Sequence, residues 1–286
     1  MDGTNTVWSD EIQGVQTLYL SRKLRFDDRF FPRYAPLFRL DREKELHILE
    51  VGCGPGALAG ALHRWYPRAH IFAVDRDSRF IAFAREQEPE IEFKEGDATS
   101  LPYEDGAFDV TISHTVHEHV EPNAFWGEQR RVLRPGGVCL CLSVRKSLRC
   151  KAPGLAPTAE EAAFWAGVED DAFDRYQVGR YATDEARLPA DMERYGFTEV
   201  SAGYIPIDLT PDDPKYPRDF AAQIIESERQ ADLEAIRSVR SPLAGPAINA
   251  VNAKYDERMR LLAEGVHQWD TETILTMAVR GVKRPA

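Results

Sequence analysis

The chain of 286 residues has few of the features that mark secreted, membrane or metal-binding proteins. It holds only four cysteines and no CxxC pair, which argues against a disulfide framework and against a zinc site. No apolar run approaches the roughly 18 residues that a membrane-spanning helix needs, and no basic segment followed by an apolar one opens the sequence. We therefore expect a reduced, cytoplasmic protein without a bound metal and without a membrane partner.

The chain also lacks long basic clusters, and its acidic residues outnumber its basic ones. It has 36 Lys and Arg against 47 Asp and Glu, a formal net charge of −11, and its longest basic cluster lies within residues 145–151. Binding to nucleic acid through many phosphates needs more positive charge than this, so we expect no nucleic-acid partner. The 43% of hydrophobic residues is that of an ordinary folded protein, and the length fits one large domain or two small ones.

Short apolar runs alternate with helical patterns between residues 46 and 144. Such alternation is typical of βαβ units and predicts an α/β fold with a mostly parallel sheet. The turn Arg134-Pro135-Gly136-Gly137 should end the last helix of this block and lead into its last strand. The expected strands are 46–51, 70–74, 91–94, 108–113 and 138–144, and the expected helices are 57–65, 78–87 and 123–133.

The pattern differs on either side of this block. Residues 1–45 have apolar positions at helical spacing and predict an N-terminal helical arm or lid. We expect the core domain to comprise 46–206 and 271–286, with 145–183 as an irregular insertion and strands near 197–206 and 273–282. Residues 207–270 should form a helical insertion that caps the core before its last strand. An apolar stripe from Ile248 to Trp269 within it is expected to be buried.

The stretch from Ile48 to Gly56 runs from a strand into a glycine-rich turn that opens a helix. Glycines at such a turn allow a tight reversal and let a ligand approach the backbone N–H groups, so we expect a bound cofactor. The spacing Gly52-x-Gly54-x-x-Ala57, followed by Asp75, also satisfies the loose dinucleotide fingerprint. A nicotinamide-dependent oxidoreductase therefore stays open on this motif alone.

Three further motifs favour a different cofactor. Glu50 precedes the turn and gives the pattern E-x-G-x-G-x-G, Gly96-Asp97-Ala98 follows the third strand, and Leu133-Arg134-Pro135-Gly136-Gly137 precedes the fifth. Together they resemble the class I S-adenosylmethionine-dependent methyltransferases, in particular the small-molecule group that includes the ubiquinone/menaquinone-biosynthesis C-methyltransferases. The resemblance implies a Rossmann-like, seven-stranded, mostly parallel sheet with helices on both faces, to which this chain adds the arm and the helical insertion.

The resemblance also implies roles for single residues at the carboxyl ends of the strands, where open α/β sheets bind their ligands. Glu50 would lie near the amino group of the cofactor, and Asp75 would accept both ribose hydroxyls, although they could instead brace the turn and cap a helix. Asp97 and the N–H of Ala98 would bind the adenine. The implied cofactor-binding set is Glu50, Gly52, Cys53, Gly54, Gly56, Asp75, Arg76, Asp97, Ala98, Ser113, His114 and His119.

Three of the seven histidines fall between Ser113 and His119. Three ligands from one short loop are unusual for a metal, so we expect none there. His114 and His117 are candidate general bases, since an imidazole suits the removal of a proton near neutral pH. His119 could have a structural role. A base is needed only for an acceptor that holds its proton, so the cluster favours an oxygen or nitrogen acceptor and leaves carbon or sulfur open.

The residues after the fourth strand carry neither an Asn-Pro-Pro-Tyr run nor a Pro-Cys pair, which mark enzymes that methylate bases. The arm and the insertions are rich in aromatic residues, which could enclose a small, partly apolar molecule or simply pack on the sheet. We predict direct in-line transfer of a methyl group from S-adenosyl-L-methionine to a small-molecule acceptor. A non-catalytic S-adenosylmethionine-binding protein is a second alternative, and the oligomeric state is left open, with a homodimer among the options.

Overall fold

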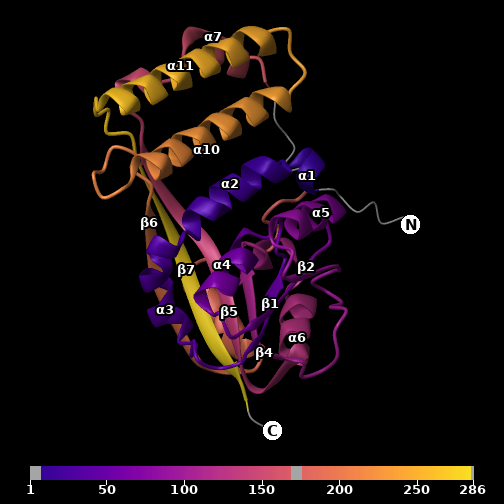
Figure 1. The fold of residues 1–286 in the computed structure, drawn as a ribbon. Helices are drawn as coiled ribbons and strands as arrows, with labels where there is room; N and C mark the ends of the chain where they lie inside the picture. The colour runs from indigo at the N-terminus through magenta and orange to yellow at the C-terminus, as the bar shows by residue number, and fades with distance from the viewer. Residues whose placement is uncertain (1–7, 169–175, 285–286) are drawn as a thin grey trace. The chain divides into compact units, whose positions relative to one another are not determined.

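The computed structural model describes residues 8–168 and 176–284. Part of the expected insertion and the start of the expected arm thus lie outside the described residues. Seven strands form one sheet in the order β3-β2-β1-β4-β5-β7-β6 (Figure 1). Their bounds are β1 His47–Val51, β2 His70–Asp75, β3 Glu92–Glu95, β4 Phe108–His114, β5 Leu133–Cys150, β6 Phe197–Asp208 and β7 Thr271–Lys283.

The central strands pair in parallel. β1 lies between β2 and β4, while β3 pairs with β2 and β5 pairs with β4. The carboxyl ends of β1, β2 and β4 therefore meet at one edge of the sheet. This arrangement confirms the fold class that the motifs predicted.

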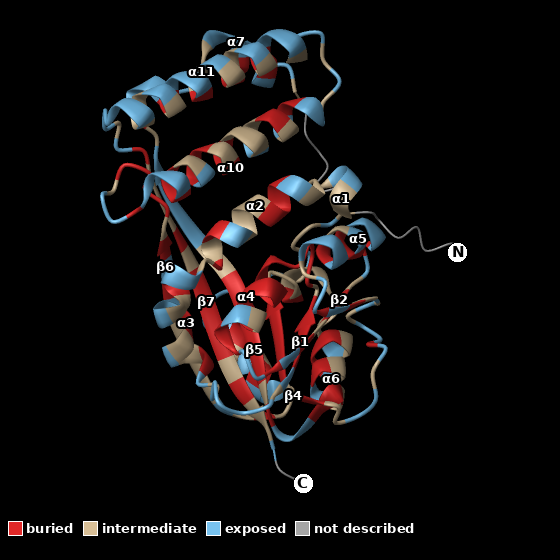
Figure 2. Ribbon diagram, viewed as in Figure 1, coloured by how far each residue is buried: buried red, intermediate tan, exposed pale blue. Residues whose placement is uncertain are grey.

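Three helices follow the first strands and match their expected positions closely: α4 Ala57–Trp65, α5 Ser78–Gln87 and α6 Pro122–Val132. Carboxylate side chains fix the starts of two of them, because Asp77 accepts from the backbone at the start of α5 and Glu121 does so at the start of α6. Figure 2 shows the central strands largely buried, while α5 and α6 keep exposed residues on one side.

The predicted fifth strand, 138–144, was too short at both ends, because β5 runs from Leu133 to Cys150, into the expected irregular insertion. The strand begins at Leu133, which pairs with Phe108, and pairing resumes at Val138 opposite Val110. The turn that we expected to precede the strand is therefore a bulge within its ladder, where Gly136 takes a φ of +79°.

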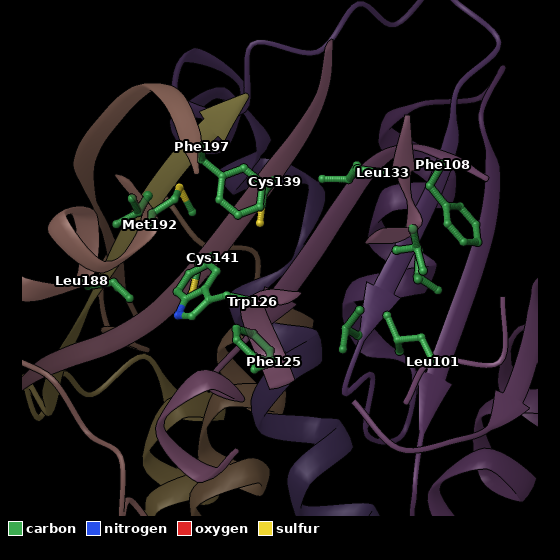
Figure 3. Packing of buried hydrophobic residues seen from close by; sticks show 14 of the residues in the cluster. Leu101, Phe108, Phe125, Trp126, Leu133, Cys139, Cys141, Leu188, Met192 and Phe197 are labelled. Atoms are coloured by element: carbon green, nitrogen blue, oxygen red, sulfur yellow. The ribbon is translucent and has the colours of Figure 1, made fainter. Parts of the chain in front are cut away.

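A hydrophobic core packs against this part of the sheet (Figure 3). Phe125 and Trp126 of α6 meet Cys139 and Cys141 of β5 there, and all four side chains are buried. The two cysteines act as small apolar residues at these positions. Leu188 from α9 (Arg187–Arg194) belongs to the same cluster.

The expected N-terminal arm consists of helices α1 Trp8–Glu11, α2 Val15–Arg25 and α3 Phe31–Phe38, with a short 3-10 helix, η1, at Asp28–Phe30. The arm packs through α2, whose buried residues are Thr17, Leu18, Tyr19 and Leu24. The ring of Tyr19 lies edge-on to Phe83 of α5 at 5.0 Å between centroids. The arm is thus part of the hydrophobic packing and not a loose extension.

The chain divides into two compact units. One comprises Met1–Arg145, Phe173–Pro206 and Leu275–Ala286, and the other Lys146–Ala172 and Ile207–Ile274. The first unit contains every residue that we expected to bind the cofactor. In the described chain, no helix combines the length and the apolar character that crossing a membrane requires.

The second unit holds α7 Ala159–Trp165, α10 Arg218–Arg237 and α11 Ala244–Glu264, with the 3-10 helix η3 at Pro153–Leu155. The apolar stripe of α11 is buried at Val251 and Tyr255, as expected, and packs against Phe164 and Leu233. The prediction was wrong at the end of the stripe. Trp269 lies beyond the helix and is 55% exposed, because the helix ends at Gly265 with a φ of +76°.

Candidate functional site

The glycine-rich turn after β1 can be built only from glycine at two of its positions. Gly52, Gly54 and Gly56 have φ angles of +72°, +52° and +86°, which side chains rarely allow. A Cβ on Gly52 would lie 2.4 Å from Cγ2 of Val116, and one on Gly56 would lie 2.9 Å from Cβ of Ala84. The turn therefore leaves no room for side chains where its backbone bends.

Asp75, at the end of β2, holds this turn in place. Its Oδ2 accepts the N–H of Gly54 at 2.8 Å, and its Oδ1 accepts the N–H of Asp77 at 2.9 Å. Burial raises the pKa of Asp75, and the bonds from Asp77 and Gly54 oppose that rise. Each carboxylate oxygen can accept a second bond, so Asp75 can hold the turn and still bind a hydroxyl group. Its neighbour Arg76 is exposed.

Glu50 is buried just before the turn, with 2% of its surface exposed. Its Oε2 has no hydrogen-bond partner among the described residues. Burial, and next the charge of Asp75, hold the pKa of Glu50 well above its ordinary value. An unpaired buried acceptor is costly, so this oxygen is suited to a donor that a ligand brings.

Cys53 lies within the turn and is buried, with its Sγ 3.5 Å from the carbonyl oxygen of Gly54. Burial, followed by the charges of Asp75 and Glu50, raises the pKa of the thiol well above its ordinary value. A thiol of this kind is a poor nucleophile.

The residues after β3 form a turn of their own. Oδ1 of Asp97 accepts both the N–H and the hydroxyl of Thr99 at 2.7 Å, while Oδ2 accepts no bond from the described residues. Asp97 is exposed, and Ala98 is half-buried beside it. One carboxylate oxygen of Asp97 thus remains for a donor from a ligand.

His114 ends β4 and is buried, with its ring edge-on to Phe26 at 5.0 Å. Its Nε2 lies 3.4 Å from a guanidinium nitrogen of Arg22. Burial, and then the charges of Arg22 and Arg25, hold the pKa of His114 well below its ordinary value, so the ring is neutral at pH 7. Ser113, one residue earlier, is fully buried, and its hydroxyl has no partner in the described part of the chain.

His117 begins the 3-10 helix η2, His117–His119, and its pKa is shifted in the opposite direction from that of His114. Its Nδ1 lies 2.8 Å from Oε2 of Glu118. Burial alone would lower the pKa of His117, but contacts with Cys141 and Glu118 outweigh it and raise that pKa to about 10. A ring that is protonated at neutral pH cannot accept a proton. The roles of His114 and His117 as general bases stay predictions. Of the two rings, only that of His114 is neutral at pH 7.

His119 braces a neighbouring segment. Its Nδ1 accepts the N–H of Gly179 at 2.9 Å, and its ring lies 4.8 Å from that of Trp8 in α1. The N–H of Tyr181 donates to the carbonyl oxygen of Glu118 at 2.9 Å. These contacts suit the structural role considered for His119 and join the arm, η2 and residues 179–181 in one place.

The residue that sequence reasoning missed is Arg22 of α2. The sequence has three basic residues between positions 22 and 25, but nothing in it indicated that one of them would reach the end of β4, 92 residues away. Arg22 donates to the hydroxyl of Thr115 at 3.0 Å, and Thr115 has a φ of +55°. Leu18, on the same helix, lies 3.5 Å from the position of a Cβ on Gly54. Helix α2 thus lies over the glycine-rich turn.

Among the described residues, no three or more His, Cys, Asp or Glu side chains are arranged to hold a metal ion. The ends of β1, β2, β3 and β4 instead present the carboxyl groups of Glu50, Asp75 and Asp97, the neutral imidazole of His114 and the guanidinium of Arg22. Such a set can bind a zwitterionic, hydroxyl-bearing molecule through hydrogen bonds.

Comparison with known proteins assigns residues 49–141 to the family described as "Methyltransferase domain". The chain is 38% identical over 101 residues to a fatty-acid O-methyltransferase of Mycolicibacterium smegmatis, covering 34% of this chain and 37% of that protein. It is 32% identical over 98 residues to a ubiquinone/menaquinone biosynthesis C-methyltransferase of Desulfotalea psychrophila, covering 33% and 40%. The curated relatives are thus matched over well under half of their length.

The fold is similar to that of a Haemonchus contortus phosphoethanolamine N-methyltransferase crystallised with S-adenosyl-L-methionine. The TM-score is 0.54 at 14% identity, covering 98% of this chain and 60% of that one. At this identity the likeness speaks for the fold alone. The sequence matches confirm the family resemblance that the motifs predicted.

Proposed function

We propose that this chain transfers a methyl group from S-adenosyl-L-methionine to a small molecule, a proposal that the match of residues 49–141 to the family described as "Methyltransferase domain" supports. When bound, that cofactor supplies a methyl group already activated on a sulfonium, so the protein need only align it with an acceptor and exclude water. The single observation that carries the proposal is the unpaired oxygen of Glu50 beside a turn that only glycine can form.

The described residues fit this cofactor. Oε2 of Glu50 is a buried acceptor suited to an ammonium group, and Asp75 at the next strand end can accept from ribose hydroxyls. Asp97 and Ala98 stand at the third strand end, where an adenine would follow. The order β3-β2-β1 would then place adenine, ribose and amino acid side by side along the sheet edge.

The proposal includes an acceptor that is a small molecule and not a nucleic acid. The net charge of −11 and the missing base-methylation motifs support this. The relatives are named for carbon and oxygen acceptors, so the shared segment of about 100 residues does not choose the acceptor atom. The choice must come from residues outside that segment.

Isothermal titration with S-adenosylhomocysteine tests the proposed function. We expect binding in the micromolar range and a loss of at least about tenfold in Asp75→Ala, because two hydrogen-bond acceptors and the anchor of Gly54 disappear together. The exposed Asp41→Ala, in the segment that leads into the amino end of β1, is the control and should bind normally. Binding of NADH in place of S-adenosylhomocysteine would favour the oxidoreductase alternative instead.

Absence of methyl transfer despite tight binding, across a broad set of acceptors, would favour the non-catalytic alternative. Equal affinity of Asp75→Ala and the unmodified protein would refute the assignment of Asp75.

A further inference from the structure

Arg22 is a half-buried cation without an anionic partner among the described residues. Its guanidinium contacts the hydroxyl of Thr115 at 3.0 Å and Nε2 of His114 at 3.4 Å, and both groups are neutral. None of the ion pairs within the described residues includes Arg22. Burial, and next the nearby charge of Arg25, lower the pKa of Arg22 to about 9, so it is still charged at neutral pH.

The two nearest carboxylates are engaged or neutral. Glu118 is paired with His117 at 2.8 Å, and the raised pKa of Glu50 favours its neutral form. A desolvated guanidinium that lacks a carboxylate destabilises a fold, and proteins keep such groups where a ligand supplies the charge. The end of β4 therefore carries a positive charge that no nearby carboxylate compensates.

The same strand end offers no free base. A guanidinium can only donate, so Nε2 of His114 accepts from Arg22, and the ring proton must lie on Nδ1. His117 is already protonated in its pair with Glu118. An acceptor that still held its proton would thus find no group in the described site placed to remove it.

The order of the strands places Arg22 on the acceptor side. The residues proposed to hold the cofactor follow β1, β2 and β3, whereas Arg22 reaches the end of β4, on the opposite side of β1 from β2. The planar fork of a guanidinium fits a carboxylate with two parallel hydrogen bonds.

From this charge and this lack of a base, we propose that the methyl acceptor is a small carboxylic acid, bound as its carboxylate by Arg22 and methylated on oxygen to a methyl ester. The inference rests on the proposed methyl transfer. One carboxylate oxygen forms the new bond to the methyl carbon, and the carbon–sulfur bond breaks with its electron pair left on sulfur. No proton is released, whereas methylation of a hydroxyl, or of an amine that is an ammonium ion in solution, releases one.

The test measures binding first, on the protein saturated with S-adenosylhomocysteine. The probes are octanoate and benzoate, each compared with its matched alcohol, octanol and benzyl alcohol, by titration calorimetry. We expect at least one of the two acids to bind and its alcohol not to. Arg22→Gln should weaken acid binding by roughly tenfold or more, because a charge-assisted bond is lost, and Arg22→Lys should recover part of it. Lys23→Gln removes the same charge from the exposed side of α2 and should behave like the unmodified protein.

Arg22 could bind the carboxylate of the acceptor or the amino-acid carboxylate of the cofactor. The affinity of each variant for S-adenosylhomocysteine distinguishes these two cases. We expect it to be unchanged in Arg22→Gln within about twofold. A loss there as large as that for the acids would overturn the proposal, because Arg22 would then hold the amino-acid carboxylate of the cofactor. Acids that bind no better than their alcohols, or equally well to Arg22→Gln, would overturn it too.

The second measurement counts protons with a pH indicator while a bound acid is converted. Ester formation without proton release is expected, and one proton per turnover would contradict the mechanism. Failure of the unmodified protein to bind S-adenosylhomocysteine would instead refute the proposed function itself, so the two failures can be told apart.

Discussion

Glu50 makes cofactor binding depend on pH in a direction that the structure determines. In the free protein, burial and then the charge of Asp75 hold the pKa of its carboxyl group well above the ordinary value, so the group keeps its proton to a higher pH than an exposed glutamate does. An arriving ammonium group would pair with Oε2 and favour the carboxylate, which expels the proton. Binding that releases one proton becomes tighter as pH rises, by up to about tenfold per pH unit while the pH is below the pKa of Glu50 in the free protein.

The substitution Glu50→Gln removes that titration. We expect its affinity for S-adenosylhomocysteine to be nearly independent of pH, and at alkaline pH to fall roughly 10- to 100-fold below that of the unmodified protein, since a hydrogen bond to a charged group contributes about 1.5–3 kcal/mol. Glu95→Gln, at the exposed end of β3, is the matched control and should keep the pH dependence.

The free protein should respond in the opposite sense. Folding raises the pKa of this carboxyl group. Its contribution to stability is therefore fully present below the pKa that it has in the unfolded chain, and is lost as pH rises toward the pKa that it has in the folded protein. Glu50→Gln should therefore raise the free energy of unfolding at neutral pH, by about 1.4 kcal/mol for each unit of the pKa shift that it abolishes.

Two assays check these expectations: calorimetric titration in buffers of different ionisation enthalpy, which counts the protons released, and urea denaturation of the free protein. The reasoning would be refuted if binding released no proton and Glu50→Gln kept the same pH profile. A variant that is less stable than the unmodified protein without ligand would show that Glu50 is ionised and paired within the fold.

Three further predictions concern stability and can be checked by urea denaturation. Gly52→Ala should lower the free energy of unfolding by about 1–3 kcal/mol, and adding Val116→Ala should recover only the part due to the contact at 2.4 Å, since the positive φ persists; full recovery would contradict this. The ion pair of His117 should stabilise the fold below pH 6.5 and lose that effect as pH rises toward about 10, and His117→Gln should remove this slope, whereas an unaltered slope would assign it to another group. In the second unit, Arg258→Ala should cost roughly 3–5 kcal/mol by leaving Asp212 buried without its partner at 2.6 Å, and a change under about 1 kcal/mol would mean that water replaces the arginine.

The sequence predicted the strands and helices between residues 46 and 144 to within a few residues because each is short, periodic and bounded by glycine or proline. It did not distinguish an interruption that ends an element from one that does not. The bulge at residues 134–137 interrupts the ladder of β5 without ending the strand, whereas the residues around Pro242 divide the helical insertion into α10 and α11. Local composition does not distinguish such cases.

At the site, the motifs predicted that Glu50, the glycines and Asp75 would lie at neighbouring strand ends. Glu50 lies in β1 just before the glycine-rich turn, and Asp75 ends the adjacent β2 and accepts the N–H of Gly54, while their roles toward a cofactor stay predictions. The charge states of His114 and His117 could not be predicted, although they lie three residues apart. One is set by Arg22, which is distant in sequence, and the other by Glu118 and by Cys141 of a neighbouring strand. Only packing decides which neighbour each ring meets.

The position of β7 between β5 and β6 has a consequence for how the chain is made. β7 is the last of the seven strands to leave the ribosome, yet β5 and β6 depend on it as their shared neighbour. Until it emerges, the growing chain carries two long strands with open hydrogen-bonding edges, which are prone to pair with other chains. β1 to β4 are complete once residue 114 has been made, but the sheet is complete only when synthesis has passed Lys283.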